Sequence, residues 1–597
     1  MQSTKTQPIQ GGEFLIRDTH FSDIFIPEEF TEEQLMIAQS VHDFVETRIE
    51  TNIQQLDNHH DRELLSKLMK EAGDLGLLGV SVPEEYEGFG QNFVTSMLST
   101  EAMGGGHSFS VAYTAHTGIG TLPILYFGTA TQKKQYLPGL ATGEILSAYC
   151  LTEPGAGSDA NSGKTKAVLN SEGTHYLING QKMWITNGGV ADLFIVFAKI
   201  DDDEDLSAFI VEKKFGNITI NPDEEKMGIQ GSSTTQVFFN DTPVPIDNLL
   251  GKRGFGFKIA LYVLNTGRIK LAAATLGASK KIIDRTIQYA NERKQFGRPI
   301  SKYGAIRFKL AEQAIQTWVT ESAAYRAAQN IEDVIQGLIE NGTEYGTATI
   351  EGIRAFAIED AILKVLGSET LDYVVDEGVQ VFGGMGYSAE APMERAYRDS
   401  RINRIFEGTN EINRMLIVDM MLRKALKGEL DLMTPATAVA NELLEIPDFE
   451  EPSDALFHAQ TKMLVNFKKA ILMVAGAAVQ KLMMSLAKEQ EILTNIADMA
   501  IQVYAAESAL LRAQKIASLK GEAACELQAA MVSTYIYDAS DKILKAGKDA
   551  INSFAEGDEW QAMMMGLRRF TKHGAFNPKL SRQLIAQKLI EENKYCF

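Results

Sequence analysis

The hydrophobic pattern changes twice along the chain, and this change constrains the fold more than any other feature. From residue 27 to residue 127 apolar side chains recur at helical spacing, with Thr31 as a candidate N-cap. From about Glu144 to Gly251 the segments are short, rich in β-branched and aromatic residues, and typical of strands. Helical spacing returns from residue 254 to residue 428. The sequence therefore predicts a mainly α protein with a small central β-domain, a barrel or a sandwich.

The length of the chain requires several domains. At 597 residues it exceeds what one hydrophobic core normally serves. A Pro- and acid-rich stretch with Pro435, Pro447 and Pro452 precedes a last helical region. The expected parts are an N-terminal extension (1–30), an N-terminal helical domain (31–145), the β-domain (146–253), a helical bundle (254–430), a linker (431–455) and an additional helical domain (456–597).

Charge and cysteine content limit the possible functions. A formal net charge of -20 argues against a nucleic-acid binder, which needs a basic face. The three cysteines, Cys150, Cys525 and Cys596, form no paired pattern, which favours a reducing compartment, and we predict no metal site.

No targeting or membrane-spanning segment is expected from the sequence. The N-terminus has neither an apolar signal segment nor an Arg-rich transit pattern, which favours the cytoplasm. The apolar stretch 471–484 is too short to span a membrane. We expect it in a core, with contact to a membrane surface as the alternative.

Two stretches of the expected β-domain have the residue types of a ligand site. The segment YCLTEPGAGSDA (149–160) ends a strand in a Gly-rich loop, whose N–H groups and hydroxyls can cradle a pyrophosphate or a flavin edge. It is not a P-loop, because Lys-Ser/Thr is missing and strands follow. The segment KMWITNGG (182–189) adds Trp184 as a flat wall and Thr186 as a hydroxyl. Each alone is common turn chemistry, and the pair is more specific.

A carboxylate before a helix start is the candidate base. In RIFEGTNEINRM (404–415), Glu407 lies between Phe406 and Gly408, and Thr409 is a helix N-cap. A solvated turn glutamate is the simpler interpretation of such a motif by itself. The remaining motifs of the chain favour a catalytic role.

Several residues of the helical regions are further candidates. Arg268 and Arg293 lie near opposite ends of one long expected helix. The Gly-rich VQVFGGMGYS (379–388) follows a helix pattern and is therefore no dinucleotide fingerprint, but its glycines allow close approach of a ligand. The small residues Gly104, Gly105, Gly106, Ser108 and Ser110 indicate close packing, with a substrate tunnel as the alternative.

In combination these motifs resemble the acyl-CoA dehydrogenase family over residues from about 30 to 425. The resemblance rests on YCLTEPGAGSDA, WITNGG, KMGIQGSSTTQVFF, the Arg268 and ERKQFG helix, QVFGGMGY and IFEGTNEI, in family order. The chain is most similar to the very-long-chain branch, which also carries an additional C-terminal region. The resemblance implies the family fold: an N-terminal helical domain, a β-barrel-like domain and a four-helix bundle.

The resemblance also implies the roles of individual residues. Glu407 would be the catalytic base, since Thr266 and Gly267, where some relatives place it, are not acidic. FAD would be held by Tyr149, Leu151, Thr152, Gly157, Ser158, Trp184, Ile185, Thr186, Thr409, Asn410 and Glu411. FAD bound mainly by the other subunit would be reached by Arg293, Gln295, Phe296, Gln380, Val381, Phe382, Gly383 and Gly384. Substrate would be contacted by Ser158, Asn265, Arg268, Phe406 and Gly408.

The implied reaction is FAD-dependent oxidation of a fatty acyl-CoA to a trans-2-enoyl-CoA. Glu407 would remove the Cα proton, and the thioester oxygen would be stabilised by the Glu407 N–H and a flavin ribityl hydroxyl. The flavin would take the hydride from Cβ and pass electrons to an electron-transferring flavoprotein. The alternatives are an oxidase of the same fold, or a scaffold protein with a vestigial site. The sequence does not predict acyl-chain length.

The last region contains a stretch whose sequence is similar to part of the bundle. The stretch 310–329 aligns without gaps on 496–515, with Glu321, Ser322 and Arg326 matching Glu507, Ser508 and Arg512. We interpret it as a degenerate repeat that has lost the chemistry, because Val479 replaces Arg293. Such a repeat would cover the surface through which shorter relatives form tetramers, so we expect a homodimer.

Overall fold

The N-terminal domain is helical, as predicted. The computed structural model describes residues 9–59, 61–443, 453 and 455–597. Thr31 caps the first helix, since its hydroxyl accepts from the N–H of Gln34 and the Gln34 side chain accepts from the N–H of Thr31. The helices of this domain are α1 (Glu32–Phe44), α2 (Ile53–His59), α3 (Arg62–Asp74), α4 (Phe93–Gly104), α5 (His107–Thr114), α6 (Leu122–Phe127) and α7 (Ala130–Thr142).

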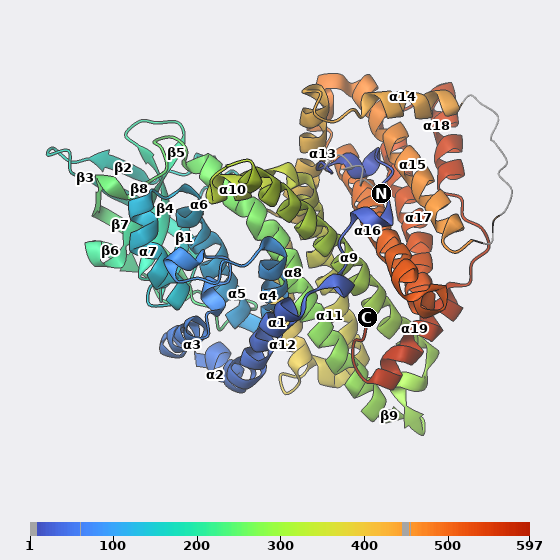
Figure 1. Ribbon diagram of the computed structural model, residues 1–597, viewed down its shortest axis with the longest axis horizontal. Coiled ribbons are helices and arrows are strands. Elements are labelled where there is room, and N and C mark those ends of the chain that lie inside the picture. Colours follow the sequence, from blue (N-terminus) through green and yellow to red (C-terminus); the bar gives the residue numbers. More distant parts are fainter. Residues whose placement is uncertain (1–8, 60, 444–452, 454) are drawn as a thin grey trace.

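The central domain is an eight-stranded sheet with the order β6-β7-β3-β2-β4-β5-β8, and β1 pairs in parallel with β4. The expected β-domain is therefore present, at the left of Figure 1. Three short strands, β2, β6 and β8, were not anticipated from the sequence because they show little alternation. The strands are β1 (Ser147–Cys150), β2 (Lys166–Leu169), β3 (His175–Thr186), β4 (Leu193–Ile200), β5 (Leu206–Glu212), β6 (Ile218–Ile220), β7 (Thr234–Pro245) and β8 (Leu249–Leu250).

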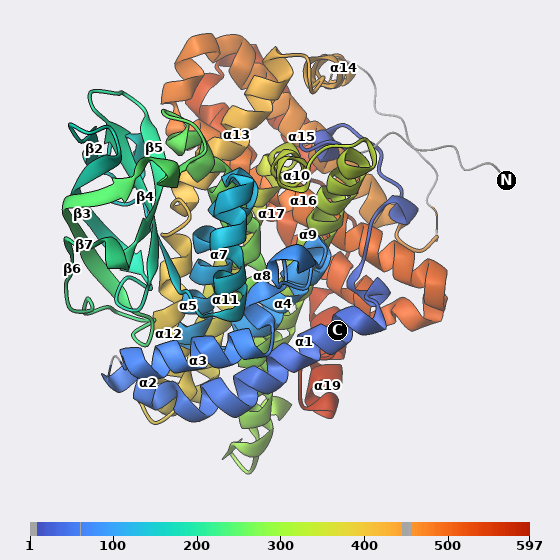
Figure 2. The ribbon, with the colours of Figure 1, turned by 60° about the vertical axis from the view of Figure 1, so that its left-hand side comes forward.

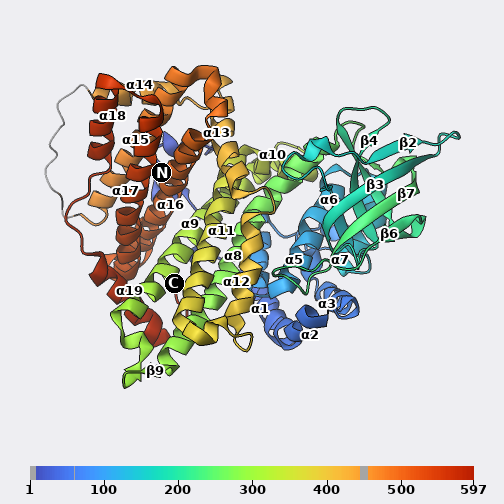
Figure 3. The ribbon, with the colours of Figure 1, turned by 180° about the vertical axis from the view of Figure 1, so that it is seen from behind.

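Long helices form the bundle in the middle of the molecule. Figures 1 and 3 show α8, α9 and α11 between the sheet and the C-terminal domain. A two-stranded hairpin, β9 (Lys294–Gln295) and β10 (Arg298–Pro299), extends from the C-terminal end of α8. The helices are α8 (Gly256–Glu292), α9 (Gly304–Glu340), α10 (Tyr345–Ala355), α11 (Ala357–Phe382), α12 (Pro392–Ser400) and α13 (Asn410–Leu426).

The C-terminal domain is helical and packs against the bundle over α9. Part of the expected linker is wrong: Pro435 lies inside a helix, α14, whose Glu442 forms ion pairs with Lys469 and Arg569. Pro447 and Pro452 lie outside the described residues. The helices are α14 (Met433–Glu442), α15 (His458–Leu482), α16 (Gln490–Lys520), α17 (Glu526–Phe554), α18 (Gly557–Phe570) and α19 (Pro578–Glu592).

Helices α9 and α16 meet through reciprocal contacts. Arg326 pairs with Glu507 at 2.8 Å, and Arg512 pairs with Glu321 at 2.6 Å. The Arg326 guanidinium lies over the Tyr504 ring, and that of Arg512 lies over Trp318. The contacts of Arg326 on α9 are therefore repeated in reverse by Arg512 on α16, as in a two-fold interface.

The N-terminal extension lies along the joint between the bundle and the C-terminal domain (Figure 2). The Gly12 N–H donates to Glu359 at 2.7 Å on α11. Glu28 and Glu29 pair with Arg512 and Lys515 on α16. This segment thus contacts both sides of the joint.

One helical segment of the described residues is longer and more apolar than predicted, but its place in a core is as predicted. The stretch His458–Lys488 has the length and hydropathy of a membrane span. Its Phe467, Ile471 and Val474 are buried in the domain core, and Lys468 forms an ion pair with the buried Glu507. In this fold the segment is therefore a core helix.

Candidate active site

Glu407 occupies a strained turn before α13. Its φ is 57°, a left-handed conformation that is uncommon for residues other than Gly, and Gly408 follows with φ 83°. Such a conformation costs roughly 1–3 kcal/mol and persists where the surroundings fix it. The Asn413 amide provides that constraint by donating to the carbonyls of Gly408 (2.8 Å) and Thr409 (3.1 Å). Thr409 caps α13, as predicted.

The carboxyl group of Glu407 lies directly over Gly267 of α8. A Cβ at position 267 would come within 2.7 Å of Glu407 Oε2, so a side chain there would displace the carboxylate. Arg268 donates from Nε to the Glu407 carbonyl at 3.3 Å and from its guanidinium to Asn265. The structure thus brings Glu407, Arg268 and Asn265 together, as predicted.

The environment of Glu407 favours a neutral carboxyl. Its Oε2 is shielded from solvent without a hydrogen-bond partner among the described residues. Burial raises the pKa of Glu407 to about 7, and the charges of Arg268 and Lys364 limit the rise. Burial and the neighbouring Glu407 carboxylate also raise the pKa of Tyr149, whose hydroxyl is likewise unpaired. A carboxylate tuned in this way can accept a proton near neutral pH.

A cavity of about 1110 Å³, including its open mouth, begins at Glu407. One wall is a stripe on α8 that includes Gly267, Ala274, Ala278 and Ile282, and the opposite wall belongs to α5 and the turn after it. Gly267 and Ile282 are fifteen residues apart, so the stripe is about 22 Å long. Gly104, Gly105 and Ser110 line this cavity, while Ser108 instead donates to Asp57. A Cβ at Gly104 would come within 2.1 Å of the Ala274 carbonyl oxygen, so the close packing expected there is confirmed, and the same residues also line the cavity.

The two β-domain motifs lie side by side. The Met183 N–H donates to the Thr152 carbonyl at 2.9 Å, and a buried ion pair between Lys182 and Glu153 (2.7 Å) fixes the Gly-rich loop. Thr186 lines the cavity with Glu407, and Phe406 completes its mouth. Gly157 has open space where a Cβ would lie, Ser158 is exposed, and the Trp184 side chain is 53% exposed. A flat wall beside an open Gly-rich loop fits a flavin.

The second group of cofactor candidates lies at the opposite end of the bundle. Gly267 and Arg293 are 26 residues apart on and just after α8, which corresponds to about 39 Å. The hairpin tip carries Phe296, 93% exposed, and Gln295 is also exposed. Gly383 and Gly384 end α11 at the same end, since the Tyr289 ring of α8 stacks on Phe382 at 3.9 Å. The structure therefore does not bring these residues to Glu407 of the same chain.

Some predicted cofactor side chains point into the protein instead. Ile185 belongs to the sheet core, Leu151 and Val381 are buried, and Phe382 stacks on Tyr289. The Asn410 side chain bonds to Lys364, Ser368 and Glu369. Only the backbone at these positions remains available to a ligand. Glu411 lies in the first turn of α13, next to Thr409.

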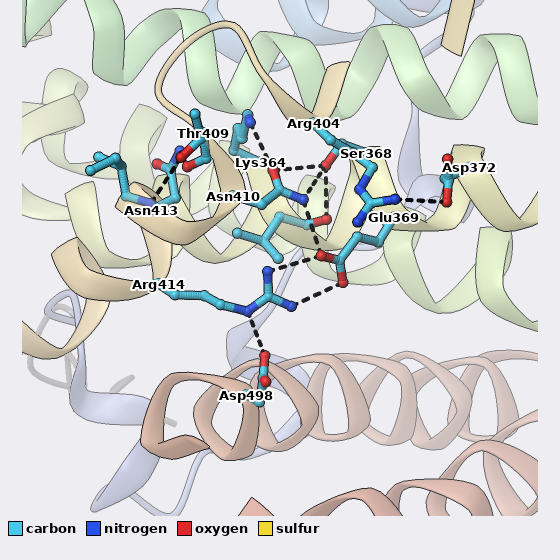
Figure 4. A network of polar contacts seen from close by, with 12 residues as sticks. Lys364, Ser368, Glu369, Asp372, Arg404, Thr409, Asn410, Asn413, Arg414 and Asp498 are labelled. Atoms are coloured by element: carbon cyan, nitrogen blue, oxygen red, sulfur yellow. Dashed lines mark hydrogen bonds and ion pairs between the residues drawn. The ribbon is translucent and has the colours of Figure 1, made fainter. Parts of the chain in front are cut away.

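A polar network that the sequence did not reveal supports the Glu407 turn (Figure 4). Lys364 donates to Asn410 at 2.7 Å, and Asn410 donates to Glu369 at 3.0 Å. Arg414 binds both oxygens of Glu369 and also pairs with Asp498 of α16 at 2.7 Å. These residues are far apart in the sequence, so no motif signals them. The network connects the C-terminal domain to the helix that follows the candidate base.

We expect Arg414→Met to destabilise the protein by about 2 kcal/mol, because Glu369 and Asp498 would lose their shared partner. Chemical denaturation monitored by circular dichroism measures the change. Arg423→Met is the control, since Arg423 lies on the same helix, is exposed and, among the described residues, pairs only with Asp419. Equal stability of both variants would contradict the structural role of Arg414.

A buried carboxylate at the mouth of a long cavity, beside a loop and tryptophan that fit a flavin, defines a flavin-dependent oxidoreductase. Family models of the acyl-CoA dehydrogenase N-terminal domain match residues 31–144, of the middle domain 148–242, and of the C-terminal domain 254–422 and again 466–569. The chain belongs to the acyl-CoA dehydrogenase family.

Individual relatives agree with this assignment. The chain is 44% identical to a probable acyl-CoA dehydrogenase of Bacillus subtilis (strain 168), over 98% of both chains. It is 37% identical to the mitochondrial very long-chain specific acyl-CoA dehydrogenase of Homo sapiens, over 82% of this chain and 75% of that one. A crystal structure of an acyl-CoA dehydrogenase complexed with FAD from Bacillus anthracis superposes with a TM-score of 0.96 and 44% identity, covering 99% of this chain and 100% of that one.

Proposed function

We propose that the protein uses FAD to oxidise fatty acyl-CoA to trans-2-enoyl-CoA, with Glu407 as the base. The observation that carries this proposal is the Glu407 carboxyl over Gly267 at the mouth of the cavity, with its pKa raised to about 7. Bound FAD would supply the hydride acceptor. Tyr149, Thr152, Gly157, Ser158, Trp184 and Thr186 would hold it.

The protein's own groups would do the remaining chemistry. The Glu407 carboxylate takes the proton from Cα of the thioester. Among the described residues no acceptor is bonded to the Glu407 N–H, which leaves it free to donate to the thioester oxygen as negative charge develops there. Arg268 fixes the turn through the Glu407 carbonyl. Apolar cavity walls exclude water from the reacting carbons.

The dimensions of the cavity favour long acyl chains. A stripe of about 22 Å along α8 accommodates an extended long-chain acyl group, whereas a butyryl group would fill only its mouth. We therefore propose a long-chain substrate. Measurement of kcat/KM from butyryl-CoA to stearoyl-CoA tests this, and an optimum at butyryl-CoA would contradict it.

The purified holoenzyme tests the function itself. We expect palmitoyl-CoA to bleach the flavin and electrons to pass to an electron-transferring flavoprotein, with little hydrogen peroxide. Peroxide release equal to substrate oxidised would favour the oxidase alternative. A colourless protein that takes up no FAD would instead favour the scaffold alternative.

We propose that Arg293, Gln295, Phe296 and the 380–384 segment contact FAD held by a second subunit of a homodimer. The separation of about 39 Å from Gly267 supports this, because these residues cannot reach the site of their own chain along α8. The reciprocal α9–α16 contacts support the proposal that the C-terminal domain is a degenerate repeat. It would cover the surface through which two dimers could otherwise pack into a tetramer.

Arg293→Ala is expected to lower both FAD content and thermal stability, because a bound ligand stabilises only the native state. The ratio of flavin to protein absorbance after gel filtration measures the first, and the melting temperature the second. Lys294→Ala, an exposed neighbour on the same hairpin, is the control. Full FAD occupancy and an unchanged melting temperature would remove Arg293 from the cofactor site.

Cytoplasmic location and peripheral membrane contact remain proposals. The free cysteines Cys150, Cys525 and Cys596 support a reducing compartment. Met484, 89% exposed, and Met483 follow α15 beside Lys481 and would be the residues that touch a membrane. Co-sedimentation with anionic vesicles tests this contact, and failure to sediment would contradict it.

A further inference from the structure

Lys270 is a buried lysine without a partner. It lies on α8, one turn after Gly267, and is only 8% exposed. Among the described residues no carboxylate, carbonyl or hydroxyl is bonded to its ammonium group. Burial alone lowers the pKa of Lys270 to about 8, without a contribution from any charged neighbour. An unpaired buried charge is costly, so a lysine in this position implies a ligand that compensates it.

Lys270 lies where three cavities meet. It lines the acyl cavity together with Gly267 and Glu407. It also lines a side chamber of about 290 Å³ that carries the hydroxyl groups of Ser96, Ser99, Tyr113 and Thr117. A third, outer cavity connects Lys270 with exposed residues such as Asn92. Among the described residues, Lys270 is the only cationic residue that lines the side chamber and the outer cavity.

No carboxylate of the described residues pairs with the Lys270 ammonium group. Glu332 lines the outer cavity, but its carboxylate accepts from the Phe93 N–H at 2.8 Å and from Gln336. Lys281, the other lysine of the acyl cavity, differs in this respect because it pairs with Glu50. Lys270 is thus the cation of the cavity that is left for a ligand.

We propose that Lys270 binds a carboxylate at the far end of the acyl chain, so that the enzyme also accepts mono-CoA thioesters of medium-chain dicarboxylic acids. This inference rests on the proposed function and specifies its substrate class. The Cα of Lys270 lies about 5 Å along α8 from that of Gly267. The carboxylate must therefore be a few methylene groups beyond Cβ, not at the distal end of the cavity. Tyr113 and Thr117 already donate to backbone carbonyls, so Ser96 and Ser99 are the side-chamber hydroxyls that would donate to its second oxygen.

The test compares matched substrates in the holoenzyme. The kcat/KM of adipyl-, suberyl- and sebacyl-CoA is measured against hexanoyl-, octanoyl- and decanoyl-CoA. The readout is the ratio of dicarboxylic to methyl-terminated substrate at each length, because a general loss of activity cancels from it. In the unmodified enzyme we expect this ratio to be highest at one chain length. Lys270→Met, of similar length without charge, should lower that ratio about tenfold or more, and Lys270→Arg should retain most of it.

Two results would overturn the proposal. One is an equal ratio in the unmodified enzyme and in Lys270→Met. The other is oxidation of the methyl-terminated substrates without oxidation of any dicarboxylic thioester, which leaves the proposed function intact. An enzyme that oxidises no acyl-CoA at all, with FAD bound, would instead overturn the proposed function itself.

Discussion

Glu407→Gln is expected to retain FAD and acyl-CoA binding while turnover falls by about 10²- to 10⁴-fold, because the amide keeps the shape of the base without its basicity. Stopped-flow flavin reduction by palmitoyl-CoA measures the chemical step directly. Glu429→Gln, which alters an exposed glutamate outside the site, should reduce its flavin at the parent rate. If Glu407→Gln reduced its flavin at a rate close to that of the parent, Glu407 would not be the base.

The raised pKa of Glu407 gives this prediction a pH dependence. Only the ionised form accepts a proton, so the rate of flavin reduction should fall as pH decreases through about 7. The contribution of Glu407 to the free energy of unfolding should change with pH in the opposite direction. A carboxyl whose pKa is raised in the folded state contributes stability at low pH and loses it as pH rises through that value. Glu407→Gln should therefore melt at a higher temperature than the parent at pH 8, with a smaller difference at pH 5.

Removal of the C-terminal domain is expected to change the assembly. A chain that ends near Thr434 would expose the apolar face of α9, including Trp318, and would leave Arg326 without Glu507. Exposed surface of this kind drives association. We expect the full chain to be a homodimer and the shortened chain to be a tetramer or an aggregate, as measured by light scattering.

A matched variant separates the loss of this surface from general instability. In the full chain, Arg512→Met removes the pairs with Glu28 and Glu321 but leaves α16 in place. It should therefore lower thermal stability and remain dimeric. A tetrameric full-length protein, or a shortened chain that stays a well-behaved dimer, would contradict the proposed role of the C-terminal domain.

Motifs with fixed local spacing were predictable from the sequence. Thr409 and Gly408 indicated a turn before a helix, and the structure places Glu407 in that turn. The order of helical and β segments gave the fold class. The β1 loop and Trp184 were recognised because their chemistry is carried by consecutive residues.

Features made by tertiary packing were not predictable. Nothing in the sequence shows that Asp498 meets Arg414, because the pairing depends on how α16 docks on α13. Lys270 follows the same rule: it is one of four lysines on α8, and its lack of a partner among the described residues appears only in the fold. The helical conformation around Pro435 was missed because proline is tolerated in the first turn of a helix.

The N-terminal extension has a consequence for how the chain folds. Gly12 bonds to Glu359, 347 residues away, and Glu28 bonds to Arg512, 484 residues away. Closing loops of this length is entropically costly, and contacts of such sequence separation form late and slowly. During synthesis Gly12 lacks its partner until α11 has been made, and Glu28 lacks its partner until α16 has been made. The extension should therefore be the last segment to gain protection from hydrogen exchange during refolding.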